Sequence, residues 1–353
     1  MRKTLLLLTV LCLSYLANAQ DILPIRGLAI AAPDKASVGR FVKFINEELP
    51  PRMINTLVLR VDYNFQYKSH PELAQENGLS QDEVNKIVTA CQKHGIDIVP
   101  QINLLGHQSW ASSLGKLLQV YPEFDETPSV TLPEKYEWPN EDGLYCKSYC
   151  PLHPEVHNVV FELVDEILAA FKADAFHAGM DEVFYIGQEE CPRCNGRDKA
   201  ELFAGELTKI RNHLARSDKK LWIWGDRLLD GKTTGLGMWE ASMNNTHRAI
   251  DMIPKDIMIC DWHYERVEPT AAYFALKGFD VATSSWRKGE VAKAQLTLLE
   301  NMRKNANKET AQHIKGMVHT SWSSVSSFLD RFYAPLDKTK VDDAVCFRML
   351  FGE

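Results

Sequence analysis

The feature that most constrains the fold of this chain is an alternation of eight short apolar runs with helical segments, which follow seven of the runs. Runs rich in Val, Ile and Leu that alternate with helices are typical of a parallel sheet covered on both faces. Eight such units in 353 residues predict a (β/α)8 TIM barrel in a single domain. A doubly wound open sheet is the alternative, but no glycine-rich phosphate motif follows the first run. The runs lie at residues 28–32, 55–61, 96–104, 173–176, 221–224, 257–260, 279–283 and 317–320.

The first 19 residues have the pattern of a secretory signal peptide. Arg2 and Lys3 precede an apolar run over residues 5–16, and Ala17-Asn18-Ala19 is a small-x-small cleavage site. The run is too short to span a bilayer comfortably, and no later stretch approaches that length. We therefore expect cleavage after Ala19, a barrel over residues 20–353, and a secreted or periplasmic protein without a membrane span.

The charge of the chain argues against one class of partner, and its cysteines allow three interpretations. The formal net charge is −7 and no basic block occurs, so we expect no nucleic-acid partner. Cys146 and Cys150 precede the Cys-x-x-Cys pair Cys191 and Cys194. Loop disulfides, a structural metal site built from these four, and free thiols are the three interpretations.

Polar and aromatic residues gather at or just beyond the carboxyl ends of the apolar runs. In a TIM barrel the active site lies at this end of the strands, so we expect these side chains to share one rim. Aromatic faces beside hydrogen-bonding groups predict a carbohydrate site, although each tryptophan alone could belong to the core. No metal-ligand spacing such as His-Glu-x-x-His occurs, so we expect no catalytic metal and no cofactor. The residues are His107, His177, Asp181, Glu182, Trp224, Asp226, Trp262, Tyr264, Trp286 and Trp322.

Asp181 and Glu182 are adjacent, which limits the chemistry they can share. Most glycosidases use two carboxyls from separate strands, about 5–5.5 or about 6.5–9.5 Å apart. Adjacent residues could instead reach the leaving-group oxygen and the substituent on the next carbon of one sugar. This geometry suits substrate-assisted hydrolysis, in which a 2-acetamido group attacks C1. Glu182 would act as general acid and then base, while Asp181 would hold the acetamide N–H.

The run His177-Ala178-Gly179-Met180-Asp181-Glu182 resembles the His-x-Gly-x-Asp-Glu signature of glycoside hydrolase family 20, the β-N-acetylhexosaminidases. Pro100-Gln101-Ile102-Asn103 with Gly106-His107 is similar to the family motif Pro-Glu-Ile-Asp followed by Gly-His. The resemblance implies a retaining enzyme that removes terminal β-linked GlcNAc or GalNAc from glycans. It also implies that Arg26 binds the sugar 3- and 4-hydroxyls and that Trp224, Trp262 and Trp322 wall the site.

Departures from the family pattern keep two alternatives open. Gln101 and Asn103 replace two acids, and Trp322-Ser323-Ser324 lacks the glutamate of the family's Trp-x-Glu. The alternatives are a glycan-binding barrel without turnover and a glycosidase for modified hexosamines. Arg60 and Asp62 are interpreted as a salt bridge at the barrel rim and not as site residues.

Overall fold

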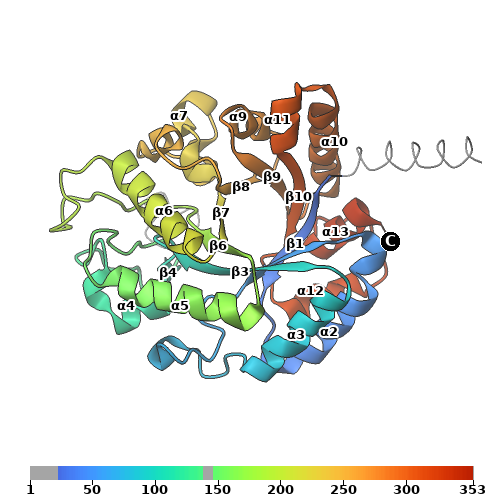
Figure 1. Cartoon of the computed structure of the whole chain (residues 1–353), viewed down its shortest axis with the longest axis horizontal. Helices are drawn as coiled ribbons and strands as arrows, with labels where there is room; N and C mark the ends of the chain where they lie inside the picture. Colours follow the sequence, from blue (N-terminus) through green and yellow to red (C-terminus); the bar gives the residue numbers. More distant parts are fainter. Residues whose placement is uncertain (1–22, 138–145, 353) are drawn as a thin grey trace, which may run out of the picture.

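The computed structural model describes residues 23–137 and 146–352, so the predicted signal peptide lies outside the described residues. Eight parallel strands close into a barrel in the order β1-β10-β9-β8-β7-β6-β3-β2, with helices around it (Figure 1). The predicted TIM barrel is confirmed, and the doubly wound alternative is wrong. The strands are β1 (Ile25–Ala31), β2 (Thr56–Arg60), β3 (Asp97–Leu104), β6 (Ala175–Gly179), β7 (Lys220–Trp224), β8 (Met258–Trp262), β9 (Asp280–Ser285) and β10 (Ile314–Thr320), with a separate antiparallel pair of β4 (Ser109–Trp110) and β5 (Ser113–Leu114).

The helices follow the apolar spacing of the sequence, except between β7 and β8, where only short helical turns occur. The longer helices are α2 (Val38–Glu47), α3 (Gln81–Lys93), α5 (Val156–Phe171), α6 (Lys199–Ala215), α9 (Thr270–Leu276), α10 (Gly289–Asn305), α12 (Val325–Phe332) and α13 (Asp343–Phe351). The short ones are α4 (Lys116–Val120), α7 (Gly231–Thr234), α8 (Gly237–Glu240) and α11 (Lys308–His313). Single 3-10 turns are η1 (Lys35–Ser37), η2 (Pro50–Arg52), η3 (Pro71–Leu73), η4 (Pro122–Phe124), η5 (Asp226–Leu228) and η6 (Thr246–Asp251).

Helix α3 shows how the local sequence fixes an element boundary. The Ser80 hydroxyl accepts the Glu83 N–H while the Glu83 carboxylate accepts the Ser80 N–H, which is the predicted capping box. Gly95 has φ +64° just after the helix, a conformation that favours glycine.

The core has two layers because side chains alternate along each strand. One layer packs between the sheet and the helices. The other fills the barrel itself and is small, since the two tryptophans of β7 occupy much of its space. Its buried members are Ala29, Val58, Val99, Trp222, Trp224, Cys260, Ala282 and Val318.

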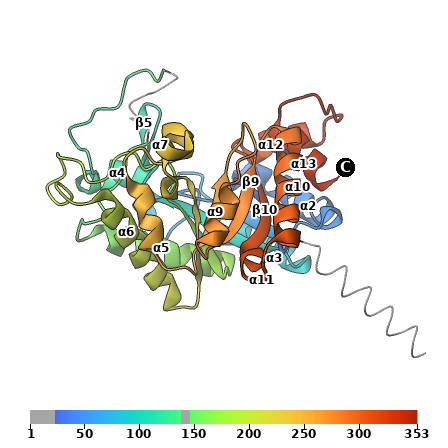
Figure 2. The ribbon, with the colours of Figure 1, turned by 90° about the horizontal axis from the view of Figure 1, so that it is seen from above.

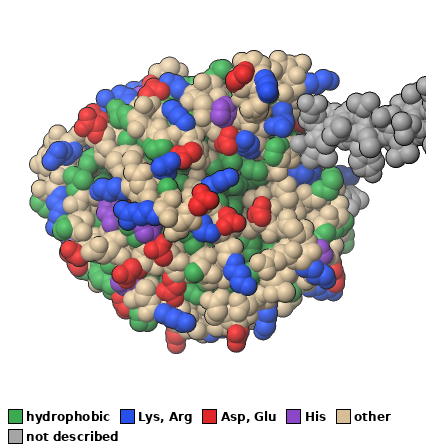
Figure 3. All heavy atoms as spheres, in the orientation of Figure 1, with side chains coloured by type: hydrophobic (Ala, Val, Ile, Leu, Met, Phe, Trp, Pro, Cys, Tyr) green, Lys and Arg blue, Asp and Glu red, His purple; other side chains and the backbone are tan. Residues whose placement is uncertain are grey.

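Two long connections lie together on one side of the barrel. The chain between β3 and α5 and the chain between β6 and α6 both run through this side, with α4 and β5 among them (Figure 2). Within the described residues no helix is both long enough and apolar enough to cross a membrane. On the face in Figure 3, acidic and basic side chains are interspersed, and no block of one sign gathers there.

Candidate active site

The turn after β6 holds the two adjacent carboxylates in an unusual backbone conformation. Gly179, Met180 and Glu182 have φ of +69°, +70° and +49°. A Cβ at Gly179 would lie 2.4 Å from the Asn103 side-chain oxygen, so only glycine fits there. Met180 and Glu182 occupy a region that L residues rarely adopt, and such strain persists only where the surroundings enforce it. The sequence did not predict this strain.

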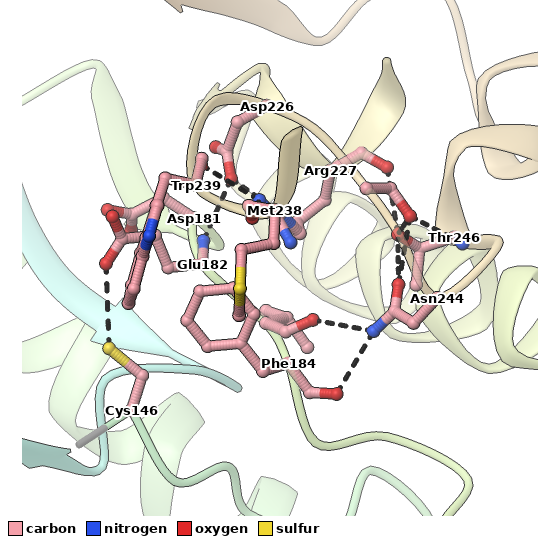
Figure 4. A network of polar contacts seen from close by, with 12 residues as sticks. Cys146, Asp181, Glu182, Phe184, Asp226, Arg227, Met238, Trp239, Asn244 and Thr246 are labelled. Atoms are coloured by element: carbon pink, nitrogen blue, oxygen red, sulfur yellow. Dashed lines mark hydrogen bonds and ion pairs between the residues drawn. The ribbon is translucent and has the colours of Figure 1, made fainter. Parts of the chain in front are cut away.

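His107 lies between the two carboxylates. Its Nε2 is 3.1 Å from Asp181 Oδ2 and 3.5 Å from Glu182 Oε2. Its Nδ1 is 3.5 Å from the Cys146 thiol, which in turn donates to Glu182 Oε2 at 3.6 Å (Figure 4). His107 was predicted at this site, whereas Cys146 was assigned to a disulfide, a metal site or a free thiol. His107 is therefore placed to tune both acids electrostatically.

The environment separates the proton affinities of the two carboxyls. Burial raises the pKa of Glu182 to about 7; the charges of Asp181 and Asp226 add to this, and those of His107 and Arg227 oppose it. Burial would also raise the pKa of Asp181, but the charge and hydrogen bond of His107 outweigh it and lower this pKa. Near neutral pH Asp181 is therefore ionised while Glu182 is about half protonated. Two acids whose environments push their pKa values apart are suited to different roles.

A charged pair from the end of β7 anchors the backbone of Glu182 (Figure 4). Asp226 accepts the Glu182 N–H at 2.9 Å and the Arg227 Nε–H at 2.7 Å through Oδ2, and the Trp262 indole N–H at 3.2 Å through Oδ1. Arg227 also donates to two carbonyls of α8. Asn244 donates to the Val183 and Phe184 carbonyls, just beyond the pair. The structure thus brings Asp226 to the site, fully engaged with protein groups.

His177, on strand β6, supports the same turn through a hydrogen bond to its backbone. Its Nδ1 accepts the Gly179 N–H at 3.0 Å, and the side chain is fully buried beside Trp224. Burial lowers the pKa of His177 to about 3, so the ring is neutral. Its Nε2 has no partner within the described part of the chain. His177 therefore orients the backbone that carries the carboxylates.

Four of the predicted aromatic residues contact one another in a single cluster. Tyr264 stacks on Trp262 with ring centroids 5.1 Å apart and lies 5.3 Å from Trp286. Its hydroxyl accepts the Trp322 indole N–H at 3.2 Å. Trp322 is 38% exposed, whereas Trp224 is 1% exposed and fills the barrel interior. Trp224 is thus a core residue, and Trp262, Tyr264, Trp286 and Trp322 form one cluster of rings.

Arg26 does not join this group, and its predicted placement is wrong. It is the second residue of β1, at the amino end of the barrel, whereas Asp181 and Glu182 follow the carboxyl end of β6. Its guanidinium donates to the Arg52 carbonyl and lies over the Phe351 ring. The expectation rested on the resemblance alone, since Arg26 already stood at the start of the first predicted strand, at the end of the barrel away from the site.

Arg60, at the carboxyl end of β2, is the arginine that reaches the site. Its guanidinium lies 4.5 Å from the Trp322 ring centroid and donates to the Ser321 carbonyl at 3.1 Å. Its Nε is buried without a partner among residues 23–137 and 146–352. Burial lowers the Arg60 pKa, against the charges of Asp62, Tyr264 and Asp181. The sequence signal for a site role was the position of Arg60 at the end of an apolar run, but the sequence favoured a salt bridge between Arg60 and Asp62.

The cysteines divide into separate groups. The seven cysteines within the described residues are all free, so the loop disulfides that the sequence suggested are not formed here. Cys150, Cys191 and Cys194 meet at Glu126, and Cys146 is separate from them. His107, Cys146 and Glu182 also place one ligand atom each within 4.8 Å of one another, a set that could hold a metal ion.

Comparisons with known proteins agree with this geometry. The model of "Glycosyl hydrolase family 20, catalytic domain" matches residues 60–332. A β-hexosaminidase of Vibrio furnissii is 25% identical over 205 residues, 57% of this chain and 29% of that protein. A lacto-N-biosidase of Bifidobacterium bifidum is 26% identical over 171 residues, 44% of this chain and 14% of that protein. The chain therefore spans less than a third of these curated relatives.

Solved structures show the same fold at low identity. The chitobiase of Flavobacterium johnsoniae superposes with a TM-score of 0.64 at 19% identity, over 93% of this chain and 48% of that one. A β-N-acetylhexosaminidase from Bacteroides fragilis superposes with a TM-score of 0.63 at 16% identity, over 94% and 66% of the two chains. At these identities the likeness concerns the barrel alone.

Proposed function

The chain belongs to glycoside hydrolase family 20, and we propose that it is a retaining hydrolase of terminal β-linked N-acetylhexosamines. The observation that carries the proposal is the pair Asp181 and Glu182 at one histidine, with the pKa of Asp181 lowered and that of Glu182 raised to about 7. One neighbouring acid is thus ionised when the other can still donate a proton. The names of the relatives support a hexosamine substrate.

Each carboxyl has a role in the proposed reaction. Protonated Glu182 donates its proton to the glycosidic oxygen as the bond from C1 breaks, while the sugar's acetamide oxygen attacks C1 from the opposite face. Ionised Asp181 accepts the acetamide N–H and stabilises the positive charge of the oxazolinium intermediate. Glu182 then takes a proton from water, which opens the intermediate with retained configuration. Asp181 Oδ1 is buried without a hydrogen-bond partner in the described chain, which leaves an acceptor for that N–H.

The walls of the site suit a sugar ring. Trp262, Tyr264, Trp286 and Trp322 supply apolar faces, and Arg60 supplies donors for hydroxyls in the role that Arg26 was expected to have. Because Ser324 replaces the family glutamate after β10, a preference for hexosamines modified at the 4- or 6-position is the second candidate. A barrel that binds glycans without turnover is the outcome if hydrolysis is absent but binding persists.

Hydrolysis of chromogenic β-GlcNAc and β-GalNAc substrates by the mature protein tests the proposal. We expect turnover by the wild type and losses of several orders of magnitude in Glu182→Gln and Asp181→Asn. Glu290→Gln, an exposed acid on α10, is the matched control and should leave the rate unchanged. Absence of both hydrolysis and binding of a thiazoline analogue would overturn the assignment of the two acids.

We also infer that residues 1–19 direct export and that residues 20–353 form the mature barrel. The support is the sequence pattern alone. Amino-terminal sequencing of the protein recovered from the periplasm or medium should begin at Gln20, and recovery of uncleaved protein in the cytoplasm would contradict this.

A further inference from the structure

Three thiols and one carboxylate converge at a buried point outside the active site. Cys150 lies on the connection between β3 and α5, whereas Cys191 and Cys194 lie on the connection between β6 and α6. The Cys150 sulfur is 3.3 Å from that of Cys194 and 3.4 Å from that of Cys191. Glu126 completes the group, and the four ligand atoms all lie within 4.8 Å of one another. Below, these four residues are called the cysteine cluster.

The carboxylate of Glu126 is the observation that points to a ligand. Glu126 is fully buried, and its Oε1 accepts the Gln188 N–H at 3.1 Å. Its Oε2 is buried without a hydrogen-bond partner in the described chain. A buried carboxylate oxygen without a partner is costly, because it has lost its hydration. A cation at the centre of the cysteine cluster would remove that cost.

The spacing of the sulfurs fits a shared metal better than a disulfide. A disulfide holds two sulfurs about 2.05 Å apart and would leave the third cysteine unused. In a tetrahedral zinc site with Zn–S bonds of about 2.3 Å, sulfurs lie about 3.8 Å apart. The observed separations of 3.3 and 3.4 Å are much closer to the second value. The Cys-x-x-Cys spacing of Cys191 and Cys194 is also common in structural zinc sites.

We propose that Glu126, Cys150, Cys191 and Cys194 bind one structural zinc ion. Thiolates favour Zn²⁺ over hard cations, and a carboxylate oxygen is an accepted fourth ligand. All four residues are fully buried, so no coordination position remains open for water or substrate. Because cysteines bind zinc as thiolates, binding would release thiol protons, and metal affinity would fall as the pH falls.

This zinc ion would tie together the two connections that shape the active site. Cys191 is nine positions after Glu182, and Cys150 is four after Cys146, whose thiol contacts both His107 and Glu182. The two connections lie side by side at the left of Figure 1 and are bridged by the bond from Gln188 to Glu126. We therefore expect metal loss to loosen the surroundings of Glu182 while the barrel persists.

The first experiment measures the zinc content of the full mature protein after purification without chelators. We expect one zinc per chain by elemental analysis, and loss of thermal stability when a strong chelator removes it. Metal-free protein should take up Co²⁺ with the sulfur-to-cobalt absorption bands of a tetrahedral thiolate site. These readouts do not depend on any sugar substrate, so the zinc proposal can fail independently of the proposed hydrolase.

Variants separate this site from the second set of possible ligands around His107. Cys194→Ser should lose the zinc, and Glu126→Gln, which keeps the shape of the side chain, should release zinc to a chelator at least tenfold faster. Cys91→Ser, a buried cysteine of α3 outside the cysteine cluster, should keep one zinc per chain. Cys146→Ser should also keep it. If Cys146→Ser loses the zinc while Cys194→Ser retains it, the ion belongs to the active site and the proposal is overturned.

Three further results would overturn the proposal even if Cys194→Ser does not fold. One is wild-type protein that contains no zinc and takes up neither Zn²⁺ nor Co²⁺ after reduction. Another is a disulfide within the cysteine cluster, seen as two cysteines protected from alkylation in the unfolded, unreduced protein. A third contrary result is iron in place of zinc, which colour and elemental analysis would reveal.

Discussion

Replacing His107 with glutamine should move the whole pH profile of hydrolysis upward. The imidazole is held between Asp181 and Glu182, and its pKa is well above the usual range, because the charge and hydrogen bond of Asp181 outweigh the effect of burial. A protonated His107 therefore lowers the pKa of both acids. Glutamine keeps a donor near the position of Nε2 but removes the charge, so both pKa values should rise.

The size of this effect follows from the distances. Unit charges 3.5 Å apart, the separation of His107 Nε2 and Glu182 Oε2, interact by about 5 kcal/mol at an effective dielectric constant of about 20, which is an upper bound of about 3.5 pKa units. Shifts of about 1–3 units are typical for carboxyls beside one opposite charge. Because Arg227 still opposes the rise at Glu182, we expect about one to two units.

The assay is kcat/KM for a chromogenic β-GlcNAc substrate between about pH 4 and pH 10, where each limb reports one essential group. In the wild type, activity should fall as the pH rises through about 7, since Glu182 loses its proton. In His107→Gln both limbs should lie at higher pH. His213→Gln, which removes a histidine paired with Asp165 on the outside of the barrel, should leave both limbs in place. A lower rate with unmoved limbs would refute the electrostatic role of His107 and leave a scaffold role only.

Three further predictions test neighbouring parts of the site. The fold raises the pKa of Glu182, so the stability that its protonated form contributes is present below the unfolded pKa of about 4.3 and is lost as the pH rises through about 7. Glu182→Gln should therefore stabilise the protein by up to about 3.5 kcal/mol in thermal denaturation near pH 8, and a gain that persists near pH 4 would contradict this. Asp226→Leu leaves the buried Arg227 unpaired and should cost about 3–5 kcal/mol in denaturant unfolding, whereas a loss below 1 kcal/mol would show that the pair is not structural. Arg60→Ala should raise KM about tenfold or more and Arg26→Ala should not, as expected for one lost charged hydrogen bond; equal effects would contradict the reassignment of the arginine.

The barrel could be predicted because the apolar pattern that identifies each strand and helix lies within that segment's own residues. A role carried over from a motif was less certain than the fold. The resemblance implied a sugar contact for Arg26, but Arg26 is the second residue of β1, and the structure places it at the end of the barrel opposite the site. Arg60 ends an apolar run and belongs to no motif. The pairing of β2 with its neighbouring strands places its guanidinium over the Trp322 ring.

Contacts between loops that are far apart in the sequence could not be predicted from the spacing of residues. Cys146 and Cys150 are close in sequence, which suggested that they act together. The Cys146 thiol instead points to Glu182, while Cys150 joins Cys191 and Cys194. Glu126 had no motif at all, and only its burial beside three sulfurs reveals it.

The strained turn at Met180 to Glu182 explains why so many supports meet there. Two non-glycine residues with positive φ would relax if the turn were free, with a cost of the order of 1–3 kcal/mol each. His177 holds the turn from the strand side through Gly179, and Asp226 holds it through the Glu182 N–H. Asn244 holds the carbonyls that follow. Because Asp226 and Asn244 both lie on the connection after β7, the position of Glu182 depends on the neighbouring strand of the barrel as well as on the local sequence. The proposed role of Glu182 as catalytic acid requires its carboxyl to lie within hydrogen-bond distance of the leaving oxygen, and these contacts hold the Glu182 backbone in one position before substrate binds.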